Sequence, residues 1–465
     1  MQYEQYLKVI DEKQPEIEAL SDYIWEHAEP AYHEFKSSKR LSDELEANGF
    51  TVTRKLIGMP TAFKATYGEG HPAFGILAEF DALDGLAQEA GALSPKPLEG
   101  KRYGHGCGHN LFAGGSFAAA IAVKAFLEDR GAGSVTLFGC PAEEGGGGKA
   151  FMAREGVFKG IDAFVSWHPE RFFMPRTRPS LAAVSIDYSF KGIAAHAGGS
   201  PQRGRSALDA VELMNVGANY LREHMDYTSR IHYAMIDSGG TAPNVVQAHA
   251  TVRYMIRTVD SESLAALVAR VDKVAQGAAL MTETEMSKAM LPAYSNLITN
   301  SVLQKTAYEA MSDIPVPQPD ENDLAFGKAL QETMSLSSAD KKLPLYQSFV
   351  VPPAPPKPHG GSTDTADVSW NAPTVQMHIG NWVTGTPGHS WQAVAQGKSR
   401  YAKAAMLYAG KAIAGTIFRL YDDPALLLEA RKEFLEKTES GYVNLNPPEV
   451  QPPVPPREEW PEDYR

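Results

Sequence analysis

The sequence predicts an α/β fold, in which a three-layer domain with a mostly parallel sheet is interrupted by a smaller α+β domain. Short apolar runs alternate with helical patterns up to residue 182, as they do in parallel sheets covered by helices. A β-α-β-β-α order then covers about 110 residues, which is typical of an antiparallel sheet with two helices on one face. Helix-rich α/β character resumes near residue 295. We therefore expect segments 1–182 and 295–465 to form the larger domain and segment 183–294 to form the smaller one.

The elements of the larger domain follow from hydrophobic periodicity. Residues 5–28 carry apolar side chains at helical spacing among charges, which predicts one amphipathic helix. Residues 73–78 form a continuous apolar run that ends in acidic residues, as expected of a buried strand in a parallel sheet. Farther along, a buried helix is expected over 113–128, with strands over 135–140 and 163–167.

The smaller domain and the C-terminal region also carry clear patterns. The expected elements of the smaller domain are strands over 184–190, 231–236 and 248–256 and helices over 206–224 and 264–279. A proline-rich segment at 351–358 predicts a loop. The tail at 447–465 is expected either to extend over a surface or to be disordered.

Composition and charge exclude several classes of protein. Of the 465 residues, 43% are hydrophobic and 22% are charged, which excludes a fibrous or wholly disordered chain. The net charge of −12, without a run of five Lys or Arg residues, argues against a nucleic-acid partner. The longest apolar stretch, 111–127, is interrupted by Lys124 and reads as too short and too polar for a membrane span, so no membrane partner is expected. No signal-peptide pattern opens the chain, and two cysteines exclude a disulfide framework, so a cytoplasmic location is expected.

A glycine-flanked segment at 104–110 places Cys107 and His109 two residues apart. Such a turn lets the backbone close around an ion, and the N-terminus of the helix that follows would help to keep a thiolate ionised. Two other interpretations remain open at this point. The segment could be a tight turn with a buried cysteine, or Cys107 could be a nucleophile that a histidine activates.

Two adjacent carboxylates, Glu143 and Glu144, follow an apolar strand and precede a run of glycines. Adjacent buried carboxylates repel each other, so this position is costly unless a cation lies beside them. A metal ion would bind one carboxylate and leave the other free as a general base. The alternative is a pair of solvated loop glutamates.

Two histidines complete a candidate ligand set. His168 ends a predicted strand, at the edge where open α/β sheets place their sites, and His389 lies in a turn-rich loop. Each histidine alone is more simply explained as structural. Together with Cys107, His109 and a glutamate, they provide N, O and S ligands suited to Zn²⁺ or another transition metal. Five ligands exceed what one tetrahedral ion takes, which predicts two metal ions that share a bridging ligand.

These residues resemble those of the dinuclear metallohydrolases that include aminoacylases, carboxypeptidase G and N-acyl-amino-acid amidohydrolases. The motif His-x-Cys-Gly-His at 105–109 looks like that of the amidohydrolase subgroup, and the resemblance covers nearly the whole chain. Further segments that carry it are 142–145, 192–197, 240–245, 361–364, 367–369 and 388–390. The last three look most similar to one subunit of a two-subunit amidohydrolase of this family.

The resemblance implies a role for each of these residues. The implied ligands of two divalent metal ions per subunit, Zn or Mn, are Cys107, His109, Glu144, His168 and His389. Glu143 is implied as the catalytic base, and His196 and Asn244 as residues of the smaller domain, the lid, that touch substrate. In this family the lid histidine comes from the partner subunit of a lid-to-lid homodimer, so a homodimer is implied, with a second homologous subunit as a further option. Asn110 is a departure, because much of the subgroup has Asp there, and it could alter how the neighbouring ligands are oriented.

Two further residues carry open alternatives. Asp81, after the first apolar strand, either orients a histidine ligand or has a structural role. Arg257, at the end of a lid strand, either binds a substrate carboxylate through its planar fork or forms a surface salt bridge.

The expected activity is metal-assisted hydrolysis of the amide bond of an N-acyl- or aminoacyl-amino acid, such as a p-aminobenzoyl-glutamate-like conjugate or a dipeptide. Glu143 is expected to move the proton. Two alternatives remain, a non-catalytic metal-binding or partner subunit and a cysteine hydrolase that uses Cys107. Glu143 argues against the first of these, because a non-catalytic subunit has no need of that carboxylate.

Overall fold

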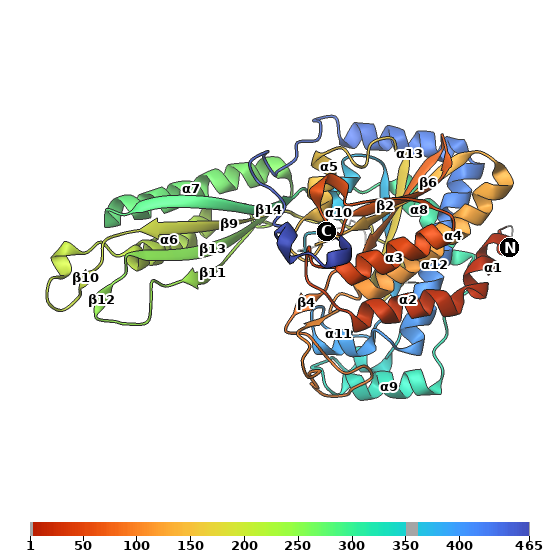
Figure 1. The fold of residues 1–465 in the computed structure, drawn as a ribbon, viewed down its shortest axis with the longest axis horizontal. Helices are drawn as coiled ribbons and strands as arrows, with labels where there is room; N and C mark the ends of the chain where they lie inside the picture. Colours follow the sequence, from red (N-terminus) through yellow and green to blue (C-terminus); the bar gives the residue numbers. More distant parts are fainter. Residues whose placement is uncertain (1–2, 350–360, 465) are drawn as a thin grey trace.

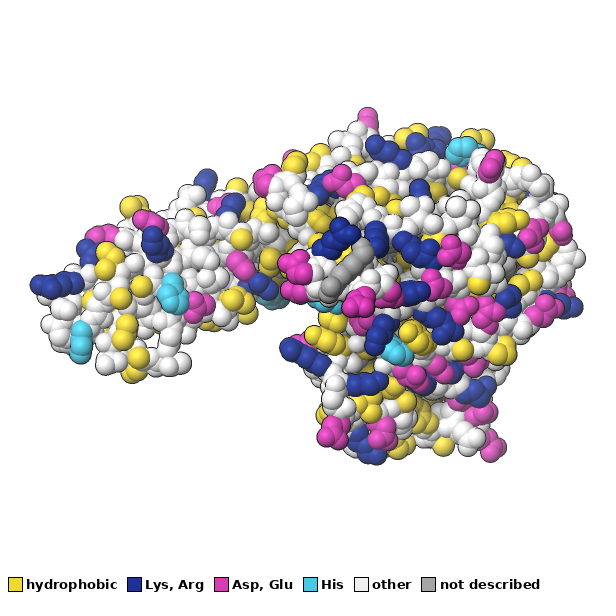
Figure 2. All heavy atoms as spheres, viewed as in Figure 1, with side chains coloured by type: hydrophobic (Ala, Val, Ile, Leu, Met, Phe, Trp, Pro, Cys, Tyr) yellow, Lys and Arg dark blue, Asp and Glu magenta, His cyan; other side chains and the backbone are white. Residues whose placement is uncertain are grey.

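The computed structural model describes residues 3–349 and 361–464. A long, narrow lid (residues 182–294) projects from a larger body that the flanking parts of the chain form together (Figures 1 and 2). The predicted fold class is therefore confirmed. The boundaries given for the two domains stay a prediction, but the lid has an apolar core of its own, which extends along the chain from Ala182 to Ala293.

The body is built on a seven-stranded sheet in the order β1-β2-β6-β3-β7-β15-β8. The four neighbours β6, β3, β7 and β15 run parallel, and β1, β2 and β8 pair antiparallel at the two sides. The strand bounds are β1 Thr51–Arg54, β2 Phe63–Glu69, β3 Ala73–Glu79, β6 Gly133–Cys140, β7 Ala163–Glu170, β8 Met174–Pro175 and β15 Thr374–Gly380. Every residue of β3 is buried, which explains its continuous apolar run.

Helices α4 and α12 pack against the central strands and against each other, and α1 and α2 lie outside α4. The helices of the body are α1 Glu4–Glu12, α2 Gln14–Glu26, α3 Phe35–Ala47, α4 His109–Arg130, α5 Gly148–Arg154, α8 Ser301–Ser312, α9 Glu321–Gln331, α10 Thr365–Ser369, α11 Trp391–Gln396, α12 Arg400–Asp422 and α13 Pro424–Lys437. A short hairpin of β4 Leu83–Asp84 and β5 Tyr103–Gly104 precedes α4. Helices α5 and α10 contact each other where strand β14 (Glu285–Tyr294) of the lid enters the body (Figure 1).

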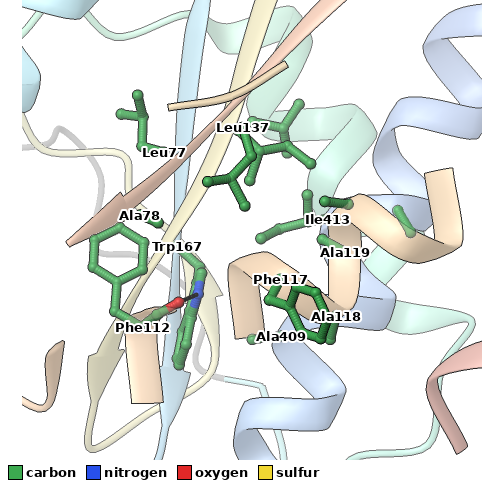
Figure 3. Packing of buried hydrophobic residues seen from close by; sticks show 14 of the residues in the cluster. Leu77, Ala78, Phe112, Phe117, Ala118, Ala119, Leu137, Trp167, Ala409 and Ile413 are labelled. Atoms are coloured by element: carbon green, nitrogen blue, oxygen red, sulfur yellow. Dashed lines mark hydrogen bonds between the residues drawn. The ribbon is translucent and has the colours of Figure 1, made fainter. Parts of the chain in front are cut away.

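Small residues let α4 lie close to the sheet and to α12. A Cβ added at Gly115 would lie 2.7 Å from the Trp167 ring, and one added at Gly410 would lie 2.7 Å from the Ala118 Cβ. Figure 3 shows Trp167 wedged beside α4, where its Nε1 donates to the Phe112 carbonyl oxygen at 3.2 Å. The Ala- and Gly-rich composition of α4 is therefore a requirement of close packing.

Helix α4 also corrects one sequence argument. It has 22 residues and is long and apolar enough to cross a membrane by length and composition, whereas the stretch 111–127 read as too short and too polar. In the structure 89% of its most apolar window is buried in the body. Burial inside the protein accounts for its apolar character, as in the core helices of many proteins.

The lid is a four-stranded antiparallel sheet in the order β11-β13-β9-β14. Helices α6 and α7 pack on one face of it, as predicted. The bounds are β9 Ala182–Lys191, α6 Ala207–Leu221, β11 Arg230–Asp237, β13 His249–Thr258, α7 Ser261–Thr282 and β14 Glu285–Tyr294. A separate two-stranded antiparallel sheet of β10 Ala195–His196 and β12 Val245–Val246 lies at the far end of the lid (Figure 1). Strand β14 was not predicted, because its first half has few apolar side chains.

Several predicted bounds differ from the structure. The single helix expected over 5–28 is two helices that meet at Lys13, because Pro15 cannot continue a helix and fits only its first turn. The helix expected over 113–128 begins earlier, at His109. Strand β7 continues to Glu170, so His168 lies within it rather than at its end.

Two predictions concern the C-terminal region. The loop predicted for 351–358 lies outside the described residues. The tail extends over the body and ends in two 3₁₀ turns, Arg457–Glu459 and Glu462–Tyr464, with Tyr464 buried and its hydroxyl donating to the Phe35 carbonyl oxygen at 2.8 Å.

Candidate metal centre

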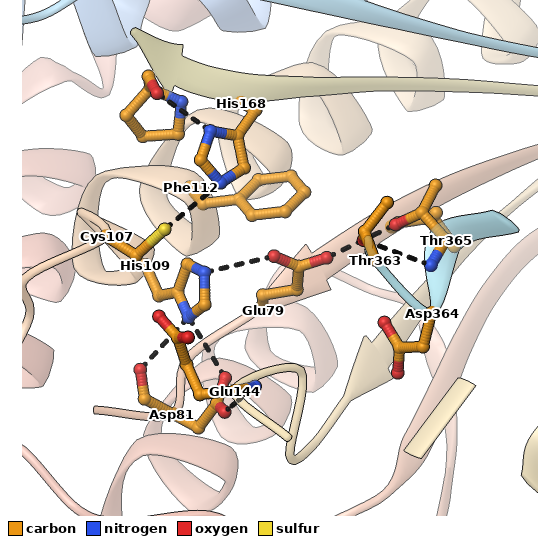
Figure 4. Close-up of polar contacts among 12 residues, drawn as sticks. Glu79, Asp81, Cys107, His109, Phe112, Glu144, His168, Thr363, Asp364 and Thr365 are labelled. Atoms are coloured by element: carbon orange, nitrogen blue, oxygen red, sulfur yellow. Dashed lines mark hydrogen bonds and ion pairs between the residues drawn. The ribbon is translucent and has the colours of Figure 1, made fainter. Parts of the chain in front are cut away.

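Four of the five candidate ligands lie together at one edge of the body sheet (Figure 4), and His389 approaches Glu144 there. Strands β3 and β6 are parallel, so their carboxyl ends bring Asp81 and the turn with Glu143 and Glu144 to the same edge. Helix α4 begins here at His109, and β7 carries His168 beside them. The fold thus brings together residues that are far apart in the sequence.

His109 is completely buried, and Asp81 orients it. Its Nδ1 lies 3.0 Å from the Asp81 backbone oxygen and 3.0 Å from Oδ1, which assigns the ring proton to Nδ1. Among the described residues Nε2 has no hydrogen-bond partner, and Glu79 Oε2, 3.2 Å away, has none either. Although burial acts to lower the pKa of His109, Asp81 and Cys107 raise it, so without metal its Nε2 carries a proton and forms an ion pair with Glu79. A bound cation would take the place of that proton between the two buried atoms. The predicted orienting role of Asp81 agrees with this contact.

Cys107 faces His168. The Sγ atom lies 3.4 Å from Nε2 of His168, whose Nδ1 lies 2.7 Å from the Pro169 carbonyl oxygen. The ring proton therefore belongs to Nδ1, and the Nε2 lone pair is directed toward Cys107. Burial, together with the charge of His109, lowers the pKa of His168 to about 3, which favours the neutral imidazole that metals bind.

Glu144 and His389 form the other side of the centre. Glu144 Oε2 lies 3.4 Å from His389 Nε2, while Glu144 Oε1 is buried and has no hydrogen-bond partner among the described residues. The Glu144 backbone N–H donates to Asp81 Oδ2 at 2.8 Å. His389 has a left-handed backbone (φ 55°), and its N–H donates to the Gly106 carbonyl oxygen at 3.1 Å. This bond ties the distant loop to the turn that holds Cys107.

The five residues fit two divalent ions. One ligand atom from each of Cys107, His109 and His168 lies within 4.8 Å of the others, and the same is true of Cys107, Glu144 and His389. The two groups share Cys107, which makes it the candidate for the bridging ligand that the sequence predicts. The unpartnered atoms of His109 and Glu144 are the donors that an ion would satisfy. The structure brings all five together, while their role as ligands stays a prediction.

Glu143 adjoins the two groups but belongs to neither of them. A carboxylate oxygen of Glu143 and ligand atoms of Glu79 and His109 lie within 4.8 Å of one another. Burial raises the pKa of Glu143 to about 8, and the charges of Glu79 and Glu144 contribute to the rise. A base with a pKa near neutral is well matched to moving a proton.

The turn that carries both glutamates is held from outside. Ala142 has a left-handed backbone (φ 60°), a conformation that costs a non-glycine residue about 1–2 kcal/mol. Its N–H donates to Oε1 of the buried Glu34 at 2.8 Å, and the Tyr32 hydroxyl donates to the Gly146 carbonyl oxygen at 2.6 Å. Backbone strain maintained by surrounding contacts is concentrated at functional sites.

Asn110, the departure noted in the sequence, lies just behind the centre. Its amide donates to Ser21 Oγ at 3.1 Å and to the Gly397 carbonyl oxygen at 3.0 Å. It has no hydrogen bond to a candidate ligand among the described residues. Asn110 therefore ties α4 to its neighbours rather than orienting a ligand.

The predicted lid residues are not at the centre in the single chain. His196 is exposed in β10 at the far end of the lid, where its Nδ1 accepts from the backbone N–H groups of Gly198 and Gly199 (Figure 1). Asn244 precedes β12 there, and its carbonyl oxygen accepts from the Ala197 N–H at 3.0 Å. In this structure these residues contact only the lid.

Arg257 lies near the junction of the lid and the body. Its Nη1 donates to Ser362 Oγ at 2.8 Å, and no carboxylate lies within 4.0 Å of it among the described residues. The surface salt bridge that was one alternative for Arg257 is therefore absent from the part of the chain that the structure describes.

Comparison with known proteins decides the family. The sequence model of peptidase family M20/M25/M40 matches residues 75–390, which is more than half of the chain. The chain belongs to this family. One of the subunits of the p-aminobenzoyl-glutamate hydrolase of Escherichia coli (strain K12) is 41% identical over 458 residues, covering 94% of this chain and 95% of that protein.

Two further proteins are similar to this chain over most of its length. The Xaa-Arg dipeptidase of Mus musculus is 28% identical over 440 residues, covering 91% of this chain and 90% of that protein. A dinuclear metal-binding M20 peptidase of Bacillus subtilis shares the fold, with a TM-score of 0.54 at 17% identity and coverage of 88% of this chain and 98% of that chain. As an M20 member, the chain is a metal-dependent amidohydrolase that cleaves the amide bond of N-acyl- or aminoacyl-amino acids, as the resemblance implied.

Neither alternative function is favoured by these findings. The related proteins are hydrolases, which argues against a non-catalytic subunit. A cysteine nucleophile needs a lowered thiol pKa, whereas burial and the charge of Glu144 raise the pKa of Cys107.

Sequence reasoning missed a buried ion cluster beside the centre. Lys149 Nζ lies 2.8 Å from Glu79 Oε1 and 2.5 Å from Asp364 Oδ1, and all three side chains are buried. Glu79 is one of the acidic residues that follow the apolar run 73–78, and Asp364 belongs to segment 361–364, which carries the family resemblance. Nothing local distinguishes Lys149 from an exposed lysine, because its burial depends on these two distant partners.

Proposed function

We propose that the chain hydrolyses an N-acyl- or aminoacyl-amino acid, either a p-aminobenzoyl-glutamate-like conjugate or a dipeptide. The relatives named for p-aminobenzoyl-glutamate hydrolase and Xaa-Arg dipeptidase support these two substrate classes. Both cysteines are free thiols, which supports the cytoplasm as the proposed location.

The proposed cofactor is a pair of divalent ions, Zn²⁺ or Mn²⁺. Cys107, His109, Glu144, His168 and His389 would hold them. When bound, such ions polarise the amide carbonyl and lower the pKa of the attacking water. A thiolate among the ligands favours zinc over manganese.

Glu143 moves the proton. Its carboxylate accepts a proton from the attacking water and passes it to the nitrogen of the leaving amine. Asp81 holds the ring proton of His109 on Nδ1, which leaves Nε2 available to a metal ion. The hydrogen bond from the Glu144 backbone N–H to Asp81 fixes the position of Glu144 relative to His109. Proton transfer of this kind contributes about 10²–10⁴ in rate.

The proposed assembly is a homodimer that pairs through the lids. Strand β11 is an edge strand of the lid sheet and carries exposed Tyr233, Met235 and Ile236, while Val216 and Tyr220 are exposed on α6. An apolar edge strand invites pairing with another chain. A dimer of this kind would allow the partner subunit's His196 to donate to the oxyanion that develops during hydrolysis. A second homologous subunit remains part of the proposal, since the E. coli relative is itself named as one subunit of a hydrolase.

The observation that carries the proposal is the pair of ligand groups that share Cys107, with Glu143 beside them and outside both. The test uses the purified chain, stripped by a chelator and reloaded with Zn²⁺ or Mn²⁺, against p-aminobenzoyl-glutamate, other N-acyl amino acids and dipeptides. We expect turnover only with metal and at least a 100-fold loss in Glu143→Gln, a loss of about the size that removal of a general base causes.

Hydrolysis of nothing in this panel with either metal would overturn the proposal. Turnover that survives chelation but is abolished by a thiol reagent would instead establish a cysteine hydrolase.

A further inference from the structure

Arg176 is a guanidinium near the metal centre that the proposed reaction does not use. It follows β8, and its backbone N–H donates to the Gln376 carbonyl oxygen at 2.8 Å. Its side chain is held by two neutral acceptors, with Nη1 donating to Gln376 Oε1 at 2.7 Å and Nε donating to the Arg178 carbonyl oxygen at 3.3 Å. The orientation of the guanidinium is therefore set before any ligand binds.

No carboxylate of the described residues forms an ion pair with this cation. Among the described residues no Asp or Glu oxygen lies within 4.0 Å of Arg176, and the residues outside the described ranges include no Asp or Glu. By contrast, Arg253 in the lid binds Asp187 through two nitrogens at 2.7 and 2.9 Å. Burial lowers the pKa of Arg176 to about 10, although the more distant charges of Glu143 and Glu170 act to raise it. A half-buried cation without a contacting anion is costly, and a bound anion would reduce that cost.

Arg176 retains partial exposure to solvent, and it lies on the same face of the sheet as His168. Strand β15 pairs Gln376 with Ser166 and His378 with His168. Side chains two residues apart on a strand share a face. The row formed by Gln376 and Ser166 therefore lies about 7 Å from the row formed by His378 and His168. The bond between Arg176 and Gln376 places the guanidinium at this neighbouring row.

We infer that Arg176 binds the carboxylate of the amino acid on the leaving side of the substrate, an inference that rests on the proposed function. In an N-acyl amino acid the carboxylate carbon is three bonds from the scissile carbonyl carbon, a span of at most about 4 Å. A guanidinium contact adds an N···O distance of about 2.8 Å. The reach from the scissile carbon to a guanidinium nitrogen is thus of the same order as the spacing between the two rows, and the planar fork of arginine suits a carboxylate.

The test compares N-benzoyl amino acids with their carboxamides, which lack only the negative charge. Binding is measured by calorimetry on the metal-loaded Glu143→Gln protein, in which substrate turnover is slowed. We expect the acid to bind about 10- to 100-fold more tightly than the amide. Adding Arg176→Gln should remove this preference and leave the binding of the amide unchanged, whereas Arg178→Gln in the same segment should retain the preference.

Three outcomes would overturn the inference. Arg176→Gln could keep the preference for the acid, Arg257→Gln could remove it in place of Arg176→Gln, or neither compound could bind. If the wild-type chain hydrolyses the acids and Arg176→Gln leaves KM unchanged, only the inference fails. If the wild-type chain neither binds nor hydrolyses them, the proposed function fails with it.

Discussion

Asp81 Oδ1 lies 3.0 Å from His109 Nδ1, and both side chains are buried. Burial acts to raise the pKa of Asp81, but the hydrogen bond from His109 and the N–H of Glu144 hold it below its usual range. The ionised carboxylate of Asp81 thus orients two candidate ligands, His109 at the start of α4 and Glu144 in the turn after β6.

Asp81→Asn should weaken metal binding about 10- to 100-fold, because an amide cannot hold the His109 tautomer as a carboxylate does. The measurement is a titration of the metal-free protein with Zn²⁺ against a competing chelator. Asp84→Asn is the matched control, since Asp84 lies three residues along and pairs with the exposed Arg102. Equal affinity in both variants would show that Asp81 does not orient the ligands.

The adjacent glutamates should behave differently. Glu143→Gln should keep both metal ions and lose about 10²–10⁴-fold in kcat, because its carboxylate is the proton carrier and lies outside the two ligand groups. Glu144→Gln should lose metal itself. Elemental analysis after dialysis, combined with kcat at saturating metal, separates the two effects. A Glu143→Gln enzyme with near-normal kcat would mean that the base is another residue.

Lys149→Met should destabilise the fold by about 3–5 kcal/mol, because it leaves Glu79 and Asp364 as buried charges without their partner. Urea denaturation of the metal-free protein measures the loss. Lys159→Met, at an exposed position close by, is the control and should change stability little. Adding Asp364→Asn to Lys149→Met should recover part of the loss, and a double variant no more stable than the single one would contradict the ion-cluster explanation.

His196→Ala should keep its metals and its fold and lose about 10²-fold or more in kcat, the scale of one lost oxyanion donor. In this structure His196 lies at the far end of the lid, so a catalytic role requires a second subunit. Mixing His196→Ala with Glu143→Gln under conditions of subunit exchange should restore some activity. One site of the mixed dimer then has an intact Glu143 and the partner's intact His196.

Complementation has a clear negative outcome. If subunits are shown to exchange and no activity returns, His196 acts within its own chain or has no catalytic role. Sedimentation of each variant alone provides the control that both remain dimers.

Much of the architecture could be predicted because its signals are local. The apolar run of β3 and the helical spacing of α7 predicted both elements close to their observed bounds. The break at Lys13 and the early start of α4 were missed. Capping residues and prolines move a helix end by only a few residues, and hydrophobic spacing alone does not resolve so small a shift. Strand β14 escaped because half of it is exposed and its pairing with β9 is not visible in the sequence.

The sequence by itself determined the fold class, the family and the candidate ligands. Parallel strands end at one edge of a sheet, so the residues that follow them lie at that edge. The Cys107–His109 turn and the adjacent glutamates are residue types that bind metal ions. Only the tertiary structure decided which atoms face each other. Lys149 and Asp364 are 215 residues apart, and Arg176 is 200 residues from the Gln376 side chain that orients it. Whether a charge is buried, paired or left open depends on such long-range contacts, because desolvation is set by everything packed around a group and not by its neighbours in the chain.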